Sequence, residues 1–287
     1  MELSVNFLRH FDYANNATLT EWTPWYQQDA LLGYVQPRFR DRGLELGIWT
    51  SHSDHLQLSP GLVSELNLRF AHFSKSAYED GLLESWVGEP FPVKASVDEP
   101  ARFIMERTLT APLGCLTFGV HLNGYVRTKQ GIELWVAKRS SNKPTFPGKL
   151  DNIVAGGQPA GLSLFQNLIK ECYEEAGISE IQAKQSIATG TVSYRHTDGH
   201  GLKRDVLYCF DLELADSFMP TCQDGEVESF ERMPIEDVLS IIANTDKFKY
   251  NCNLVILDFA IRHGVITGDE TSNYADLCAR RNQLDLF

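Results

Sequence analysis

Hydrophobic residues recur with two different periods along this chain, and the longer period marks one helix clearly. Between residues 163 and 176, apolar side chains lie three or four positions apart, at Phe165, Leu168, Ile169, Cys172 and Ala176. At about 100° per residue they gather on one face, which predicts an amphipathic helix that packs on a core. Ser163 suits the N-cap of this helix, and Gly177 suits a left-handed C-terminal residue.

The pattern before this helix is mixed. Alternating apolar residues predict strands over 31–39 and 44–50, and helical spacing predicts helices within 59–78 and over 101–110. Trp49 and Trp86 are available to line an aromatic pocket, but large aromatic side chains are more often core residues. Pro112 then interrupts the chain, so we expect a smaller α+β domain over residues 1–111.

A strand-rich region follows Pro112. Strands are predicted over 117–127, 132–138, 188–194 and 204–214, and helices over 234–243 and 251–263. We expect the Gly- and His-containing segment 195–203 to be a loop in which His196 and His200 have no role. The order of elements predicts an α/β (α+β) fold, with a mixed sheet between helices over 112–270 and a polar tail over 271–287.

Composition limits the class of protein. Of the 287 residues, 43% are hydrophobic and 22% are charged, which is typical of a globular protein. We expect no membrane span, because no apolar run approaches the roughly 20 residues that a helix needs, and no secretory signal. The six cysteines are scattered without C-x-x-C pairs. This usage predicts reduced thiols, a cytoplasmic location and no zinc site.

The net charge of −12 is unfavourable for binding nucleic acids or anionic membranes. An anionic small-molecule substrate would need a local cation, either a metal ion or a basic pocket. The oligomeric state is left open by the sequence, with a homodimer among the possibilities.

Glu171, Glu174 and Glu175 share one face of the predicted helix. Such a cluster is most often a solvated acidic surface. Here, however, the turn that contains Gly156 and Gly157 precedes the helix. Carboxylate oxygens suit Mg²⁺ or Mn²⁺, and glycines allow the backbone to approach a phosphate closely. Loop and helix together indicate a site for metal-assisted attack on a phosphate chain.

The segment resembles the Nudix box, the loop-helix motif of a family of pyrophosphate hydrolases. Gly156, Glu171, Cys172, Glu174, Glu175, Gly177 and Ile178 stand at the positions of that motif. The chain departs from the motif at Leu162, which replaces a Glu, and at Lys170, which replaces an Arg. In the family these two residues pair and support the loop, so the two changes indicate one linked structural adjustment.

Other stretches are similar to the thiamine-pyrophosphokinase-related branch of the Nudix family. They include H-L-N-G-Y-V at 121–126, T-F-P-G-K-L-D-N-I-V-A-G-G at 145–157 and D-G-E-V-E-S-F at 224–230. The first 111 residues are similar to a domain of uncharacterised role that precedes the Nudix domain in that branch. We expect this first domain to take part in substrate recognition. The resemblance implies hydrolysis of thiamine diphosphate, or of its oxo and oxy analogues, to the monophosphate and orthophosphate.

The resemblance also implies roles for individual residues. Glu171, Glu174 and Glu175 are expected to hold Mg²⁺ or Mn²⁺, with Gly156 and Gly157 placing backbone against metal or phosphate. A carboxylate outside the helix often serves as ligand or base, and the candidates are Glu226 and Glu228, which could equally well belong to an exposed acidic loop. The residues with a possible role in substrate binding are Lys138, Arg139, Lys149 and Asn123, each of which could instead be an ordinary surface or turn residue.

Two other functions fit the sequence. One is a Nudix pyrophosphatase that acts on a nucleotide sugar, a dinucleotide or a coenzyme. The other is a Nudix-like module that senses a ligand without catalysis. Such modules usually lack box carboxylates and carry a DNA-binding segment, whereas this chain keeps Glu171, Glu174 and Glu175.

Overall fold

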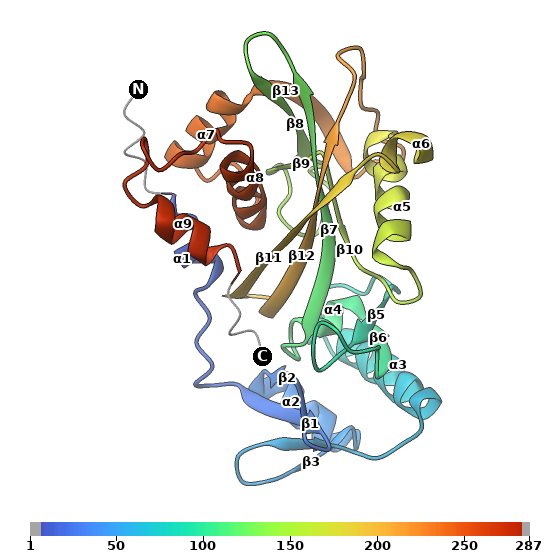
Figure 1. The fold of residues 1–287 in the computed structure, drawn as a ribbon. Coiled ribbons are helices and arrows are strands. Elements are labelled where there is room, and N and C mark those ends of the chain that lie inside the picture. Colours follow the sequence, from blue (N-terminus) through green and yellow to red (C-terminus); the bar gives the residue numbers. More distant parts are fainter. Residues whose placement is uncertain (1–6, 283–287) are drawn as a thin grey trace.

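The computed structural model describes residues 7–282, and its centre is a seven-stranded mixed sheet (Figure 1). Five strands follow one another in the order β11-β12-β7-β8-β13, while β10 pairs with β7 and β9 with β8. The strands are β7 (Leu116–Arg127), β8 (Ile132–Arg139), β9 (Leu150–Asn152), β10 (Val154–Gly157), β11 (Ile187–Asp198), β12 (Gly201–Glu213) and β13 (Val227–Pro234).

Strand β7 changes its partner halfway along its length. Its first half pairs with β10, where Gly157 lies opposite Gly119, and its last residues pair with β8, where Leu134 lies opposite Tyr125. On its other side β7 runs parallel to β12 throughout. The sheet therefore divides between β7 and β8, and the turn that leads into the box helix lies at this division.

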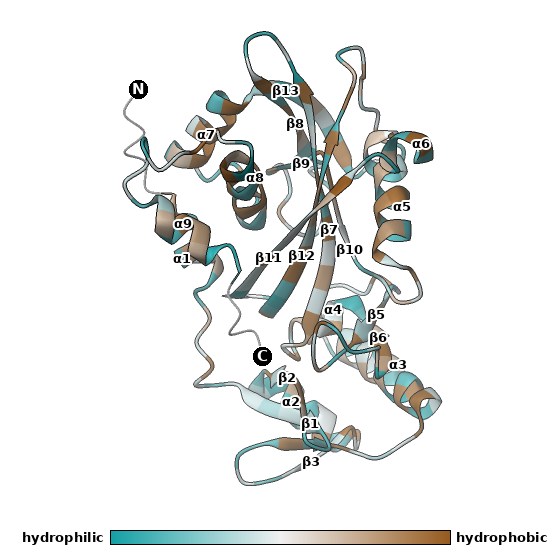
Figure 2. Ribbon diagram, viewed as in Figure 1, coloured by the Kyte–Doolittle hydropathy of each residue, from teal (hydrophilic) through white to brown (hydrophobic). Residues whose placement is uncertain are grey.

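Helices cover both faces of the sheet. The first face carries α5 (Leu164–Ala176) and the short α6 (Glu180–Ala183), and the second carries α7 (Ile235–Asn244) and α8 (Tyr250–Arg262). Helix α8 is predominantly hydrophobic because it lies between the sheet and further helices (Figure 2). Those helices are α1 (Leu8–Ala14), α7 and α9 (Tyr274–Arg280). The predicted α/β class, with a mixed sheet between helices, is confirmed.

Most of residues 23–110 form a second layered body beside this sheet (Figure 1). A four-stranded sheet, in the order β2-β1-β4-β3, packs against α2 and α3, and a two-stranded sheet, β5-β6, precedes the short α4. The elements are β1 (Thr23–Gln27), β2 (Ala30–Val35), α2 (Pro37–Glu45), β3 (Trp49–Ser51), β4 (Leu56–Leu58), α3 (Val63–Glu79), β5 (Pro90–Val93), β6 (Phe103–Glu106) and α4 (Arg107–Thr110). Trp49 is buried in the core of this body, and Trp86 is half exposed.

One of the predicted elements in this body, the strand over 44–50, is wrong for most of its length, and two others are correct only in part. The strand predicted over 31–39 ends at Val35, because Pro37 begins a helix at a position where a proline needs no hydrogen-bond donor. Most of the predicted strand 44–50 is the end of that helix and a turn. The predicted helix 101–110 is helical only in its last four residues, which form α4. Residues 103–106 are strand β6, in which Phe103 and Met105 are buried and whose backbone pairs with β5.

The predicted loop 195–203 is also wrong. Strands β11 and β12 extend through it and pair until Asp198 lies opposite Gly201, so only a tight turn remains. His196 is buried rather than exposed, since its ring stacks on Tyr250 at a centroid distance of 4.4 Å and bonds the Tyr13 carbonyl. Strand β13 is an element that the sequence did not predict, because its partly exposed, polar sequence lacks a clear alternation.

Part of the predicted tail is structured. Helix α9 buries Leu277, in the same hydrophobic cluster as Phe7 and Phe11. Residues 1–6 and 283–287 lie outside the described part of the chain. They include the beginning of the predicted first domain and the end of the predicted tail. Within residues 7–282, no helix combines the length and the apolar character that crossing a membrane requires.

Candidate active site

The box helix is α5, and residues close to it in sequence fix both of its ends. The Ser163 hydroxyl accepts a hydrogen bond from the Gln166 amide at 3.2 Å, and the Gln166 side chain accepts one from the Ser163 amide at 2.9 Å. Gly177 ends the helix with φ of 65°. The Asn167 side chain donates to the Gly157 carbonyl at 2.8 Å, which ties the helix to the glycine turn. These contacts fix where the helix carboxylates lie.

Gly156 and Gly157 are the last two residues of strand β10, where the chain enters the glycine turn before α5, and both lie close to neighbouring side chains. A Cβ atom at Gly156 would lie 2.4 Å from Cδ of Glu171, and one at Gly157 would lie 2.7 Å from Cζ of Phe91. At these distances a Cβ atom would force the Glu171 or the Phe91 side chain to move. The turn therefore lies directly against a glutamate of the box helix on one side and against the first body on the other.

The three box glutamates differ in environment. Glu171 and Glu175 are buried, and Glu174 is half exposed. The Ala155 amide donates to Glu175 at 2.7 Å, yet burial raises the pKa of Glu175 well above its usual range, and burial also raises the pKa of Glu171. Two buried carboxylates on one helix are costly unless a cation lies beside them.

Lys170, the residue that replaces the family arginine, supplies part of that positive charge. Its ammonium group donates to Glu174 at 2.6 Å and to Glu171 at 3.2 Å. Burial opposes the charge of Lys170, but the hydrogen bonds to the two glutamates keep its pKa above the usual value. Lys170 thus faces the carboxylates themselves instead of supporting the loop.

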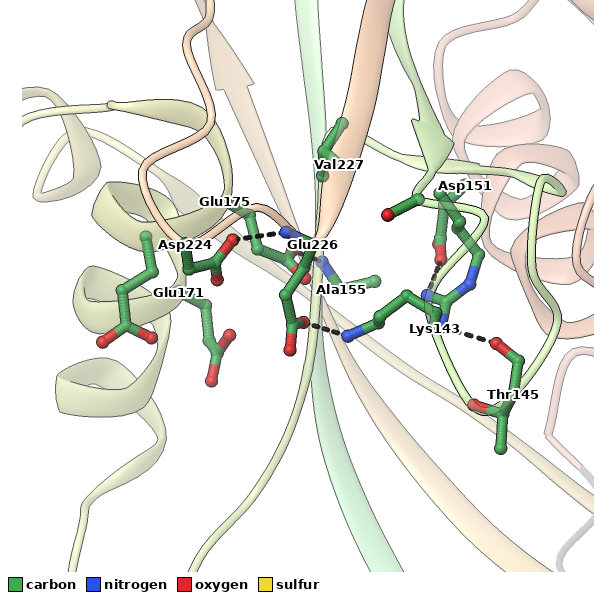
Figure 3. Close-up of polar contacts among 12 residues, drawn as sticks. Lys143, Thr145, Asp151, Ala155, Glu171, Glu175, Asp224, Glu226 and Val227 are labelled. Carbon is green, nitrogen blue, oxygen red and sulfur yellow. Dashed lines mark hydrogen bonds and ion pairs between the residues drawn. The ribbon is translucent and has the colours of Figure 1, made fainter. Parts of the chain in front are cut away.

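Glu226 approaches the box glutamates from the start of β13 (Figure 3). Its carboxylate forms an ion pair with Lys143, which reaches it from the loop after β8, and its charge contributes to raising the pKa of Glu171. Its amide donates to the Asp224 side chain at 2.9 Å. The structure therefore brings Glu226 together with the box helix.

Glu228 instead pairs with Lys138 at 2.7 Å, outside the cavity described below.

Arg139 holds the loop that carries Lys143. Its buried guanidinium donates to Asp151 at 2.8 Å, to the Thr145 carbonyl at 2.9 Å and to the Phe146 carbonyl at 3.1 Å. Phe146 has φ of 52°, a left-handed conformation that is unfavourable for an aromatic residue. The contacts of Arg139 stabilise this conformation, so they determine where Lys143 and the Phe146 ring lie.

Three other residues predicted to bind substrate lie elsewhere. Asn123 is buried in a network in which it donates to Asp211 at 3.0 Å and accepts from Asn152 at 2.9 Å. Lys149 bonds the Asp246 carbonyl. Neither of these residues lines the cavity, nor does Lys138, which is paired with Glu228.

A cavity of about 660 Å³ lies over the box helix and the glycine turn. Gly156, Gly157 and the three glutamates line it, together with Glu226, Lys143 and Arg139. A further wall comes from the first body, with Phe91 and Arg107, whose guanidinium lies 5.3 Å from the Phe91 ring centre. Sequence analysis missed these two residues and Lys143, because no local pattern links them to the box.

His121, Asp151 and Cys252 form a buried cluster beside the cavity. Among the described residues, they are the one group of three or more His, Cys, Asp or Glu whose ligand atoms all lie within 4.8 Å of one another. Asp151 already pairs with Arg139 and accepts from the Cys252 thiol at 2.7 Å. We therefore interpret the cluster as a hydrogen-bonded support. The ligand atoms of the three box glutamates do not all lie within this distance of one another, and Glu174 is paired with Lys170.

Comparison with known proteins gives consistent matches. The model of the NUDIX domain matches residues 119–253. The chain is 40% identical over 284 residues to Nudix hydrolase 24, chloroplastic, of Arabidopsis thaliana, which covers 96% of this chain and 77% of the relative. It is 41% identical over 280 residues to Nudix hydrolase 20, chloroplastic, of the same plant, covering 93% and 74%.

A solved structure, the NUDIX domain of Shewanella oneidensis NrtR complexed with ADP ribose, matches 52% of this chain and 88% of its own. The TM-score of that match is 0.42 and the sequence identity is 18%.

Proposed function

The chain belongs to the Nudix family and is a hydrolase acting on phosphorus anhydrides, and we propose that its substrate is thiamine diphosphate or an oxo or oxy analogue. The products would be the monophosphate and orthophosphate. The observation that carries the chemistry is the packing of Glu171 and Glu175 against a glycine turn at the cavity. The choice of thiamine rests on the motifs outside the box.

The residues fit a divalent cation. Glu171 and Glu175 are buried, and burial raises their pKa values. Lys170 pairs with Glu171, and the charge of Lys143 acts on Glu175. Glu171, Glu174 and Glu175 would hold Mg²⁺ or Mn²⁺ through hard oxygen atoms. When bound, the metal supplies positive charge to the phosphate oxygens and acidifies a water molecule.

The remaining steps fall to other side chains of this site. Glu226, directly before β13, is our candidate for the base that accepts a proton from the attacking water. Lys143, now paired with Glu226, would bind a phosphate oxygen and leave the Glu226 carboxylate free to act. Arg139 would position this loop rather than bind phosphate. Four residues outside the cavity have no direct role in this proposal, namely Glu228, Lys138, Lys149 and Asn123.

We also propose the division into a first domain over 1–111, a Nudix domain over 112–270 and a tail over 271–287. Because α1 and α9 pack on α8, the first residues and the tail would stabilise the Nudix domain. The first domain would recognise the substrate through Phe91 and Arg107. Six free cysteines fit a reducing compartment. We retain the cytoplasm as its proposed location, although the names of two plant relatives include "chloroplastic".

The test is release of orthophosphate from thiamine diphosphate and oxythiamine diphosphate with Mg²⁺ or Mn²⁺. ADP-ribose and NADH are assayed in parallel with an added phosphatase. Direct release from the thiamine compounds is expected. A signal only with the phosphatase would reject the thiamine proposal in favour of a nucleotide substrate, and no signal with any compound would favour a ligand-sensing module.

The variants Glu174→Gln and Glu175→Gln test the metal site in the same assay. Each removes one charge with almost no change in shape, and we expect turnover to fall by roughly a hundredfold or more. Glu228→Gln is the matched control, because Glu228 pairs with Lys138 outside the cavity, and this variant should retain activity. Wild-type turnover in either box variant would remove that glutamate from the proposed site.

A further inference from the structure

Another carboxylate lines the cavity from a different wall. Asp205 lies on β12, in register with Thr117 of β7 on one side and with Tyr194 of β11 on the other. The three side chains therefore form a row across neighbouring strands. The box motif plays no part in this row, and nothing in the sequence pattern marks it.

Contacts within the row hold the Asp205 carboxylate in one orientation. The Thr117 hydroxyl donates to one carboxylate oxygen, and the Tyr194 hydroxyl donates to the other at 2.5 Å. Asn251 of α8 in turn donates to the Tyr194 oxygen at 3.1 Å. An ionised carboxylate offers about four acceptor positions. Each oxygen of Asp205 thus keeps a free acceptor position in a group that cannot rotate.

No cation neutralises this carboxylate. Over residues 7–282, no Lys, Arg or His side chain lies within ion-pair distance of Asp205. The neighbouring Lys203 pairs with Asp198 instead. A half-buried carboxylate with spare acceptor capacity and no cation is suited to a ligand that donates hydrogen bonds.

Aromatic rings lie close to Asp205. The Tyr250 ring is 5.4 Å from the Tyr194 ring and 5.6 Å from the Phe146 ring, between ring centres. Lys203 lies 5.1 Å from the Phe146 ring centre. The left-handed backbone of Phe146, which Arg139 holds, directs this ring towards Tyr250. Tyr194 and Tyr250 are buried and Phe146 is partly exposed, so the aromatic surface that the cavity offers beside this acceptor-only group comes mainly from Phe146.

We propose that Asp205 binds the organic group of the substrate and that this group is a heteroaromatic ring with N–H donors. The inference rests on the proposed hydrolase function and defines its substrate class. The ring would stack on aromatic surface while its N–H groups donate to Asp205, and a positive charge on the ring would strengthen the contact. An apolar organic group would leave the free acceptor positions of the half-buried Asp205 unfilled, so the cavity disfavours it.

The variant Asp205→Asn tests this proposal. An amide has the shape of the carboxylate and can still bond both hydroxyls, because a hydroxyl group can also accept. The assay compares thiamine diphosphate and ADP-ribose, which carry N–H groups on a ring, with isopentenyl diphosphate, which has none. We expect kcat/KM for the better ring substrate to fall roughly tenfold to a hundredfold, and kcat/KM for isopentenyl diphosphate to stay within about twofold.

Glu213→Gln is the matched control, since Glu213 ends the same strand outside the cavity and loses the same charge. This control variant should leave kcat/KM unchanged for the ring substrate and for isopentenyl diphosphate. Equal losses of kcat/KM for ring and non-ring substrates in Asp205→Asn would show a structural role and overturn the proposal. An unchanged kcat/KM of Asp205→Asn for the ring substrates would also overturn the proposal.

Binding measurements separate this proposal from the proposed function. Calorimetric titration with thiamine monophosphate and with AMP needs no turnover. The wild type should bind at least one of them, and Asp205→Asn should bind that ligand roughly tenfold or more weakly. If the wild type cleaves neither ring substrate but this difference remains, the proposed function fails and the ring site stands. Equal affinity of the two forms, or no binding of either ligand, overturns the ring site.

Discussion

At the scale of single residues, burial decides the properties of several polar groups of the site. His121 lies on β7 beside the cavity with 3% exposure, and burial lowers its pKa to about 4. Lys249 also lowers this pKa, whereas Asp151, the hydrogen bond to Asn152 and Asp205 act in the opposite direction. His121 therefore stays neutral in the folded protein at physiological pH.

This neutral histidine makes stability depend on pH. Its pKa is about 4 when folded and 6.5 when unfolded, so below pH 6.5 the unfolded chain binds more protons. The contribution of His121 is complete above pH 6.5 and is lost as the pH falls towards 4. From pH 7 to pH 5 we expect a loss of about 2 kcal/mol in unfolding free energy.

Denaturant titrations at pH 7 and pH 5 measure this loss for the wild type and for His121→Gln. The variant should lose about 2 kcal/mol less than the wild type between the two values, whatever its stability at pH 7. His200→Gln, in the exposed turn between β11 and β12, serves as the control and should keep the wild-type dependence. The same pH dependence in His121→Gln would contradict the assignment.

At the scale of elements, the glycine turn and α5 function as one unit. Gly156 has no positive φ, so alanine suits its backbone, but the added Cβ would lie 2.4 Å from Cδ of Glu171. The Glu171 side chain must then move, while the helix, which its capping contacts hold, need not. The variant Gly156→Ala therefore tests the position of one carboxylate with little change to the fold.

We expect Gly156→Ala to lower kcat/KM for the best substrate roughly a hundredfold, because displacements near 1 Å have effects of this size. The melting temperature should change little. Gly268→Ala is the matched control, since its Cβ would make only ordinary contact with Tyr274, at 3.5 Å, away from the cavity. Retention of wild-type activity by Gly156→Ala would mean that Glu171 need not occupy its present position.

At the scale of the whole molecule, the cavity lies between the first body and the sheet domain. Arg107 is the clearest contribution of the first body, as a half-exposed cation that pairs with Glu89 at 2.9 Å in the wall of a cavity rich in carboxylates. In a protein of net charge −12, such a cation would favour entry of an anionic substrate. The first body would then take part in binding as well as in packing.

Removal of this cation should affect binding more than chemistry. For Arg107→Ala we expect KM to rise roughly five- to tenfold, with kcat nearly unchanged and an ionic-strength dependence of KM weaker than in the wild type. Arg102→Ala, which breaks a similar pair with Glu99 outside the cavity, is the control. An unchanged KM in Arg107→Ala would confine substrate binding to the sheet domain.

Local patterns in the sequence were sufficient for the box helix and the central sheet. Ser163 and Gly177 define the ends of α5, and the spacing of apolar residues along the helix sets the face that carries Glu171 and Glu175. These features depend on neighbours in sequence, and so they could be predicted. Predictions were wrong where pairing with a distant segment decided the structure, as in β6 and in the extended β11-β12 hairpin.

Only the tertiary structure decided which charged residues meet. Lys143 and Glu226 lie 83 positions apart, and Thr117 and Asp205 lie 88 apart, so no local pattern connects them. It also gave different partners to Lys138, Arg139 and Lys149, which the sequence grouped as candidates for substrate binding, and among them only Arg139 lines the cavity. The sequence by itself determined the family and the acidic helix, because both depend on local spacing. The cavity and the ring site depend on strand register and on packing between distant segments.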